Sequence, residues 1–100
     1  MSKNISNRQT EIRIKVVPAH ERETSEIMTL FEYSSVLSTR ATQIENNSIV
    51  YVDTTGLDNP VDIAKKEIMC KKCPLSIQRD MEMNGTIEIW DVNEMIVPAL

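Results

Sequence analysis

Residues 29–43 read TLFEYSSVLSTRATQ and predict a helix that packs on two sides. The start of this helix is encoded locally. Thr29 is followed three residues later by Glu32, which is the spacing of a capping box, where each side chain accepts a hydrogen bond from the other residue's backbone amide. Met28 before the cap and Tyr33 after it have the spacing of a hydrophobic staple. We therefore expect the helix to begin directly after Thr29.

One stripe of this helix is apolar when successive residues are placed about 100° apart. Such a stripe is the face that a helix turns to the core of a small domain. Its predicted members are Leu30, Tyr33, Leu37, Ala41 and Ile44.

The opposite face of the same helix lacks the charges that normally cover a solvated surface. Between Tyr33 and Ile44 the only charged residue is Arg40. Small hydroxyl side chains beside one aromatic ring allow another backbone to approach closely, so this face is predicted to be covered as well. An exposed helix that happens to carry few charges is the alternative. The residues of this face are Phe31, Ser35, Ser38, Thr39 and Thr42.

Length and composition set limits on the class of protein. The chain has 100 residues, of which 41% are hydrophobic, enough for one small core. A net charge of −4 and a pI near 4.9 argue against a protein that grips nucleic-acid phosphates, which requires a basic patch. No apolar run approaches the ~20 residues of a membrane span, and no secretory leader is recognisable. We expect a soluble, unsecreted protein with no membrane segment and no direct sequence-specific contact with nucleic acid.

The segments around the helix have different patterns. Residues 1–11 are polar without periodicity and predict a flexible tail, followed by a single domain over 12–100. Residues 12–16 alternate apolar and basic side chains, which predicts a short strand. Residues 49–52, IVYV, predict an extended buried run.

A second helix is predicted from Pro60 to about Lys71. Asp58 or Asn59 can cap it, and proline suits the first helical position. Glu67 falls in the middle of its apolar arc, which is an unusual place for a charge. The arc consists of Pro60, Ile63, Ala64, Ile68 and Cys70.

Arg40 on the first helix is placed as unusually as Glu67 on the second. It lies at the edge of the apolar stripe, between Tyr33 and Val36 on the helical wheel. A charge beside apolar surface needs a counter-charge or must stay at the edge in water. An Arg40–Glu67 ion pair is the economical hypothesis, and two side chains that both reach outward to solvent are the alternative.

The C-terminal part of the sequence predicts β structure. Residues 75–78 and 87–89 alternate apolar and polar side chains around an Asn-Gly pair that ends at Gly85. A lengthened loop with a left-handed Gly85 aligns Ile77, Ile87 and Ile89 on one face, and Trp90 then points to the other. The predicted fold class is therefore α+β, with two main helices followed by a C-terminal antiparallel β-hairpin and preceded by a short N-terminal strand.

Motifs that carry chemistry are few. Cys70 and Cys73 have the spacing of a zinc or redox pair, but a structural zinc site needs four ligands and His20 is the only other candidate. A redox pair is usually activated at a helix N-terminus, whereas these cysteines lie at the C-terminal end of the predicted helix. The only glycines are Gly56 and Gly85, so no phosphate-binding loop is present. The sequence predicts two reduced structural cysteines, no metal, no cofactor and no catalytic residue.

Five blocks of residues, taken in order and with their spacing, resemble one family. They are TxFE at 29–32, RAxQI at 40–44, NPVxIAxxEI at 59–68, KxPLxIxR at 72–79 and ExWxVxEM at 88–95. Together they are similar to the omega/K subunit of multisubunit DNA-directed RNA polymerases, which in eukaryotes is the small sixth subunit shared by the nuclear enzymes. The resemblance covers about residues 24–97.

The sequence also departs from that family. Ser35 stands where a basic residue is frequent, and Ser38 stands where the small residue is often glycine. The hairpin loop is one residue longer, and the acidic N-terminal tail of eukaryotic versions is missing. The short tail would suit an archaeal version, whereas the segment 18–25 is more similar to versions carried by large cytoplasmic DNA viruses.

The resemblance implies a noncatalytic subunit that binds the largest polymerase subunit and promotes assembly of the transcribing enzyme. Catalysis and its magnesium would belong to the large subunits, and the chain would be located with the polymerase, in the nucleus or the cytoplasm. A free-standing regulatory module that docks one helix on a transcription or signalling partner is the alternative. The residues assigned to partner binding are Thr29, Phe31, Glu32, Ser35, Ser38, Arg40, Thr42, Gln43, Pro60, Glu67, Pro74, Arg79 and Trp90.

Overall fold

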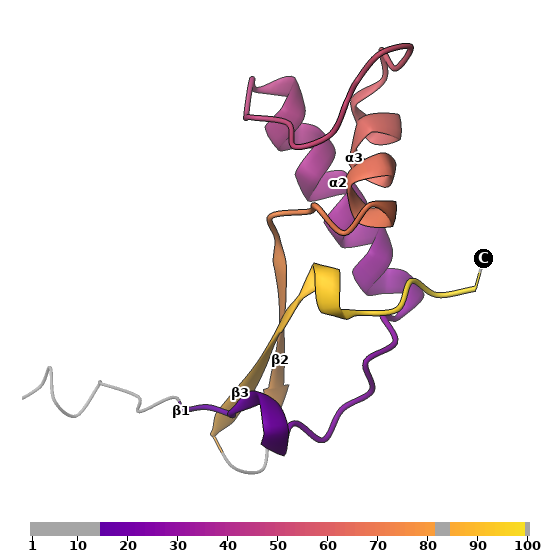
Figure 1. The fold of residues 1–100 in the computed structure, drawn as a ribbon. Coiled ribbons are helices and arrows are strands. Elements are labelled where there is room, and N and C mark those ends of the chain that lie inside the picture. The colour runs from indigo at the N-terminus through magenta and orange to yellow at the C-terminus, as the bar shows by residue number, and fades with distance from the viewer. Residues whose placement is uncertain (1–14, 82–84, 100) are drawn as a thin grey trace, which may run out of the picture. The chain divides into compact units, whose positions relative to one another are not determined.

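The computed structural model describes residues 15–81 and 85–99. It contains two α-helices and three strands, and the predicted α+β class is confirmed (Figure 1). The predicted tail 1–11, most of the predicted strand 12–16 and most of the hairpin loop lie outside the described residues. The elements in order are β1 (Lys15–Val16), the short 3-10 helix η1 (Ala19–Glu21), α2 (Leu30–Glu45), α3 (Pro60–Met69), β2 (Ser76–Met81), β3 (Thr86–Asp91) and the 3-10 helix η2 (Val92–Glu94).

The chain divides into two compact units. One unit combines residues 1–22 with 78–89, and the other combines residues 23–77 with 90–100. The first holds β1 and most of the hairpin strands. The second holds both helices and is called the helical unit. The prediction of a single domain over 12–100 stays a prediction.

The three strands form one sheet in the order β1-β3-β2. β1 runs parallel to β3, with Val16 opposite Ile87, and the Val17 amide donates to the Ile87 carbonyl over 2.8 Å. The N-terminal strand therefore pairs within this chain. Gly85 has φ +64°, so the predicted left-handed glycine before β3 is confirmed. The predicted β2–β3 register depends on residues 82–84 and stays a prediction.

Local signals set the limits of α2. The Glu32 amide donates to the Thr29 hydroxyl and the Thr29 amide donates to the Glu32 carboxylate, each over 3.0 Å, which confirms the capping box. Met28 and Tyr33, the predicted staple, both lie in the buried core. The helix ends at Glu45, and Asn47 follows in the left-handed conformation with φ 71°.

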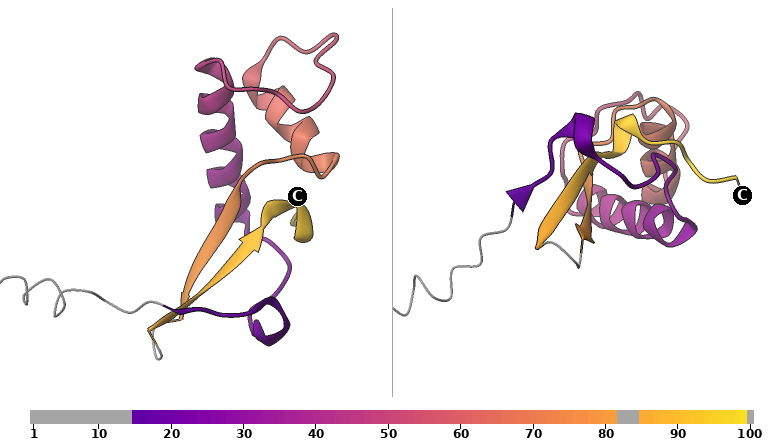
Figure 2. Two further views of the ribbon diagram at one scale, coloured as in Figure 1. Left: turned by 60° about the vertical axis from the view of Figure 1, so that its left-hand side comes forward. Right: turned by 90° about the horizontal axis from the view of Figure 1, so that it is seen from below.

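Asn59 and Pro60 start α3 as the sequence predicts. The Val61 amide donates to the Asn59 side chain over 2.8 Å, and proline occupies the first turn, where its missing amide costs nothing. The helix stops at Met69, slightly earlier than predicted, because Lys71 adopts a left-handed φ of 59°. α2 and α3 pack side by side (Figures 1 and 2).

The core of the helical unit differs in part from the predicted stripe. Leu30 was expected inside but is 60% exposed, because it occupies the first turn of α2, whereas Val36 is buried. Trp90 was expected to point away from Ile77, but both belong to the same buried cluster, and Ile89 is 40% exposed instead. The cluster consists of Met28, Tyr33, Val36, Ile68, Cys73, Ile77, Trp90, Val92 and Met95.

The predicted burial of residues 49–52 is wrong. Ile49 is 72% exposed and Tyr51 is 53% exposed, while Val50 and Val52 are half-buried. No strand of the described chain pairs with this segment. The apolar segment IVYV therefore lies partly exposed at the surface of the isolated chain.

Candidate protein-interaction site

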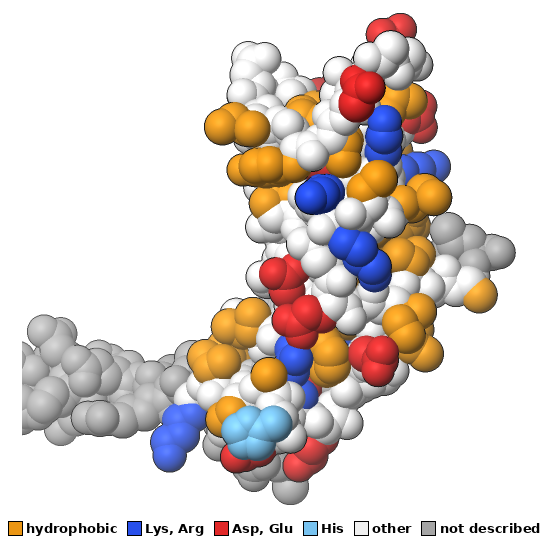
Figure 3. All heavy atoms as spheres, viewed as in Figure 1, with side chains coloured by type: hydrophobic (Ala, Val, Ile, Leu, Met, Phe, Trp, Pro, Cys, Tyr) orange, Lys and Arg blue, Asp and Glu red, His pale blue; other side chains and the backbone are white. Residues whose placement is uncertain are grey.

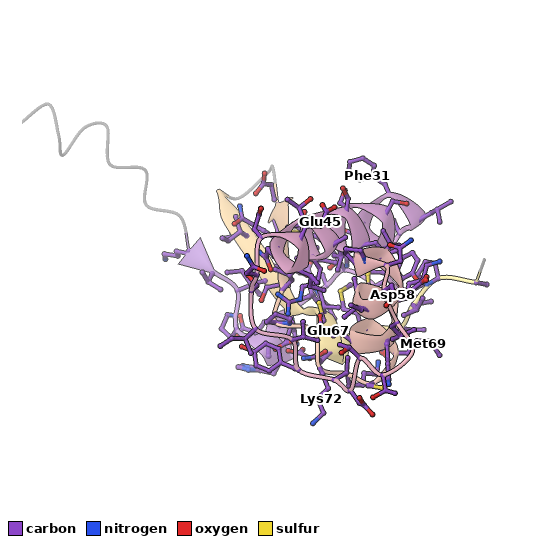
Figure 4. All side chains as sticks on the ribbon, turned by 90° about the horizontal axis from the view of Figure 1, so that it is seen from above. Phe31, Glu45, Asp58, Glu67, Met69 and Lys72 are labelled. Carbon is purple, nitrogen blue, oxygen red and sulfur yellow. The ribbon has the colours of Figure 1, made fainter. Side chains whose placement is uncertain are left out.

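The outward face of α2 is uncovered in this structure. Phe31 is 80% exposed and points away from the body of the helical unit (Figure 4). Ser35, Ser38 and Thr42 are exposed on the same side, and the Thr42 hydroxyl donates to the Ser38 carbonyl over 2.9 Å. We call these four residues the outer face. It is apolar at one end, uncharged along its length and free of bulky side chains beyond Phe31.

The inward face of α2 holds Arg40, which forms the predicted ion pair with Glu67 of α3. The Arg40 Nε lies 2.5 Å from Glu67 Oε1, and Nη2 lies 2.9 Å from Oε2, so the pair is bidentate. The two residues are 2% and 0% exposed. The hypothesis that the two side chains reach outward to solvent is excluded.

The pair also fixes the chain that follows α2. Arg40 donates from Nη2 to the Ile49 carbonyl over 2.6 Å and from Nη1 to the Gln43 side chain over 2.9 Å. Glu67 Oε2 accepts from the Tyr51 amide over 3.0 Å, and the Tyr51 ring centre lies 5.8 Å from the guanidinium carbon of Arg40. A buried pair is tolerable only when its remaining polar atoms are satisfied in this way.

The electrostatics favour the charged form of both partners. Burial alone would raise the pKa of the Glu67 carboxyl, but hydrogen bonds from Arg40 and from the Tyr51 amide outweigh burial and hold this pKa below its ordinary value. The hydrogen bond to Glu67 raises the pKa of Arg40 above its ordinary value, against the effect of burial. The network is therefore ionised at neutral pH.

The remaining residues assigned to partner binding are spread over the chain. Thr29 and Glu32 form the helix cap, Pro60 lies in the first turn of α3, and Pro74 is exposed after α3. Arg79 is half-buried in β2 and belongs to the other compact unit. Their contact with a partner stays a prediction.

Two of the residues assigned to partner binding form side-chain hydrogen bonds within the helical unit. Trp90 is buried, and its Nε1 donates to the Thr24 hydroxyl over 3.2 Å. Gln43 is half-buried and accepts from Arg40. Arg40, Gln43 and Glu67 thus form one internal network, separate from the outer face.

Sequence reasoning missed the apolar side chains that lie at the surface outside the outer face. Ile49 and Tyr51 follow α2, and hydrophobic side chains are visible on the surface over that segment (Figure 3). Ile27 and Ile96 are each about half exposed and sit opposite each other in an isolated parallel bridge. An apolar run alone does not distinguish burial in the chain from burial by a partner.

Cys70 and Cys73 differ in exposure. Both are free thiols, with Cys70 exposed and Cys73 buried, and burial raises the pKa of the Cys73 thiol. Within residues 15–81 and 85–99, no three His, Cys, Asp or Glu side chains are placed to hold a metal ion. No helix in this part of the chain combines the length and hydropathy needed to cross a membrane.

No protein-family model matches the chain. It is, however, 36% identical over 96 residues to "DNA-directed RNA polymerases I, II, and III subunit RPABC2" of Schizosaccharomyces pombe, an alignment that covers 96% of this chain and 67% of that protein. This chain belongs to the RPABC2 family. The resemblance predicted from the five blocks is confirmed.

Further members of the family show its range. The RPABC2 of Saccharomyces cerevisiae is 41% identical over 90 residues, which are 90% of this chain and 57% of that protein. A "DNA-directed RNA polymerase subunit 6 homolog" of African swine fever virus is 34% identical over 89 residues, which are 85% of this chain and 60% of that protein. The chain thus spans 57–67% of the length of these relatives.

Proposed function

We propose that this chain is a noncatalytic subunit of a DNA-dependent RNA polymerase, which binds the largest subunit and promotes assembly and stability of the enzyme. The observation that carries the proposal is the 34–41% identity to proteins named as subunits of such polymerases. Its cellular location would then be that of the polymerase, and nucleotide addition would belong to the other subunits.

The outer face of α2 is the proposed contact with the largest subunit. Phe31, at 80% exposure, contributes nothing to the core of the isolated chain, and a large aromatic anchor beside small residues is typical of the centre of an interface. The charge-free Ser35, Ser38 and Thr42 can be desolvated at less cost than Lys or Glu. Arg40 and Glu67 support this face from inside by holding α2 against α3.

Affinity purification of the tagged chain from its native source, followed by mass spectrometry, tests the proposal. We expect two very large polymerase subunits in near-equal amount with the chain. Recovery of the chain alone as a stable monomer, or with a signalling protein and no polymerase subunit, would support the free-standing regulatory module instead.

A pair of matched substitutions tests the surface separately. Phe31→Ala and Met69→Ala each remove a large side chain that is 80% or 78% exposed, from α2 and α3 respectively (Figure 4). Both variants should unfold at the wild-type denaturant concentration. Only Phe31→Ala should reduce recovery of the polymerase subunits, and equal recovery with both variants would exclude the outer face as the contact.

A further inference from the structure

Residues 46–59, which join α2 to α3, contain neither helix nor strand. Loops of this length inside compact domains are uncommon, and they are usually either functional or disordered. Part of this one is firmly anchored, since Arg40 and Glu67 bind it at Ile49 and Tyr51, and the Lys66 ammonium donates to the Asp53 carbonyl over 2.6 Å. Side chains of α2 and α3 therefore hold the segment, and no strand within residues 15–81 and 85–99 pairs with it.

The anchored part has the exposure pattern of a β-strand. Ile49 and Tyr51 are exposed while Val50 and Val52 are half-buried, which is the two-residue alternation typical of an extended backbone, and the chain bends at Val52, where this run ends. The Ile49 carbonyl and the Tyr51 amide both turn toward the ion pair. In an extended segment, the polar groups of residues i and i+2 lie on one edge, and those of the residue between them lie on the other. Arg40 and Glu67 thus occupy one edge as a neighbouring strand would.

The other edge of this segment is open. Within the part of the chain that the structure describes, the amide and carbonyl of Val50 and the amide of Val52 have no hydrogen-bond partner in the protein. Beside this edge, Ile49 and Tyr51 keep 72% and 53% of their surface in solvent. A backbone that is fixed on one edge and unpaired on the other, flanked by exposed apolar side chains, is the arrangement that accepts an added strand.

We propose that residues 49–52 form a docking edge for an extended segment of the largest polymerase subunit, which adds to it as a β-strand. The partner backbone pairs with Val50, and apolar side chains of the partner cover Ile49 and Tyr51. This inference rests on the function proposed above and adds a second contact to the outer face. The buried ion pair then has a role beyond stability, because it orders the edge before binding and so lowers the entropic cost of association.

The unpaired backbone groups of Val50 determine which conformation the bound partner segment must have. A helix has its own amides and carbonyls paired and cannot satisfy Val50, whereas an extended chain can. A second copy of this chain could also add its own segment 49–52, and such pairing would appear as a dimer of the isolated protein. We expect the isolated chain to remain monomeric, because four residues offer too little surface for a stable dimer.

Val50→Pro tests the edge, since it removes the amide that faces the partner and keeps the Ile49 carbonyl and the Tyr51 amide that face the ion pair. Thr54→Pro is the matched control, because the Thr54 amide also lacks a partner within the described chain but lies outside the proposed strand. With both variants tagged in the native source, we expect about a tenfold loss of large-subunit recovery for Val50→Pro only. Wild-type recovery by Val50→Pro would overturn the inference.

Amide hydrogen exchange on the wild-type protein provides a test that does not depend on a variant folding. The Val50 amide should exchange at least about tenfold more slowly in the purified polymerase than in the free chain. Unchanged exchange at Val50 in the complex, or a dimer of the free chain protected at the same amide, would overturn the strand addition. Absence of any large subunit in the wild-type purification would instead refute the proposed function.

Discussion

The two faces of α2 differ in what covers them: one is buried within the chain and the other is exposed. The inner face is buried at Tyr33, Val36, Arg40 and Ala41, and its one charge is matched atom by atom to Glu67. The outer face, which begins at Phe31, is exposed throughout and makes no contact that the helical unit requires. The same helix is thus determined on one side by its own chain and left open on the other.

This difference separates stability from assembly. Changes on the inner face should alter the free energy of unfolding of the isolated chain, because they leave cavities or unpaired charges. Changes on the outer face should leave that free energy almost unchanged and alter association with the polymerase. The substitutions below test this division, beginning with the largest expected loss of stability.

The largest effect is expected for single replacements in the ion pair. Arg40→Met leaves the Glu67 carboxylate buried without its counter-charge, and Glu67→Leu leaves the guanidinium in the same position. Breaking a buried pair from one side costs roughly 3–5 kcal/mol. Urea unfolding of each variant measures this loss of stability. If the pair contributed only as a surface ion pair, each variant would lose about 1 kcal/mol or less.

The double variant distinguishes a true pair from two independent losses. Arg40→Met with Glu67→Leu removes both charges together and should recover much of the stability that either single change loses, since residues in contact are not additive. The Ile49 carbonyl and the Tyr51 amide lose their partners in this variant, so recovery should be incomplete. Strict additivity of the two losses would contradict the geometry of the pair.

Acid should weaken the inner face in the same way. The pKa of Glu67 in the folded chain lies below its ordinary 4.5, so its contribution to stability is fully present above about pH 4.5 and is lost as the pH falls through the folded pKa. Wild type should therefore lose more stability on acidification than the double variant. Urea midpoints at neutral pH and below pH 4.5 give the comparison, and parallel losses in the two proteins would assign the acid sensitivity to other carboxylates.

Inner-face features were predictable from the sequence because their causes are local or periodic. A capping box depends on the three-residue spacing between Thr29 and Glu32, and the helical wheel places Arg40 and Glu67 beside apolar neighbours, where only a counter-charge is tolerable. The RPABC2 relationship was predictable because five blocks preserve their order. These inferences do not require knowledge of what lies outside the chain.

The predictions that failed concern burial, because the sequence does not show which other residues pack over an apolar side chain. The run at 49–52 has the composition of a buried strand, yet Ile49 and Tyr51 are 72% and 53% exposed, because no other segment of the described chain packs over their side chains. Apolar periodicity likewise placed Ile89 on the face of Ile77 and Trp90 on the other face, although Trp90 is the residue that belongs to the buried cluster with Ile77. The periodicity of apolar residues shows which side chains share a face. Whether that face is buried depends on the elements that the fold packs against it.

The helix cap should have a smaller effect than the ion pair. Thr29→Ala removes the hydroxyl that accepts from the Glu32 amide, and loss of a capping side chain typically costs about 1 kcal/mol. The cap sets where α2 begins and so affects both faces equally, and the loss should appear in the isolated chain. A loss near zero by urea unfolding would mean that α2 starts elsewhere in solution, for example nearer Ser25.

The smallest effect on stability, with the largest expected effect on assembly, is that of Ser38→Leu on the outer face. Ser38 is exposed, and leucine is the better helix former, so helicity and the urea midpoint of the isolated chain should stay nearly unchanged. At a close contact with the largest subunit the added bulk would overpack the interface, and incorporation into the polymerase should fall sharply. Ser38→Ala is the matched control, because it removes the hydroxyl without adding bulk and should be incorporated normally. If Ser38→Leu entered the polymerase as well as Ser38→Ala, the outer face would not be a close packing surface, and α2 would simply be a helix with few charges on its solvated side.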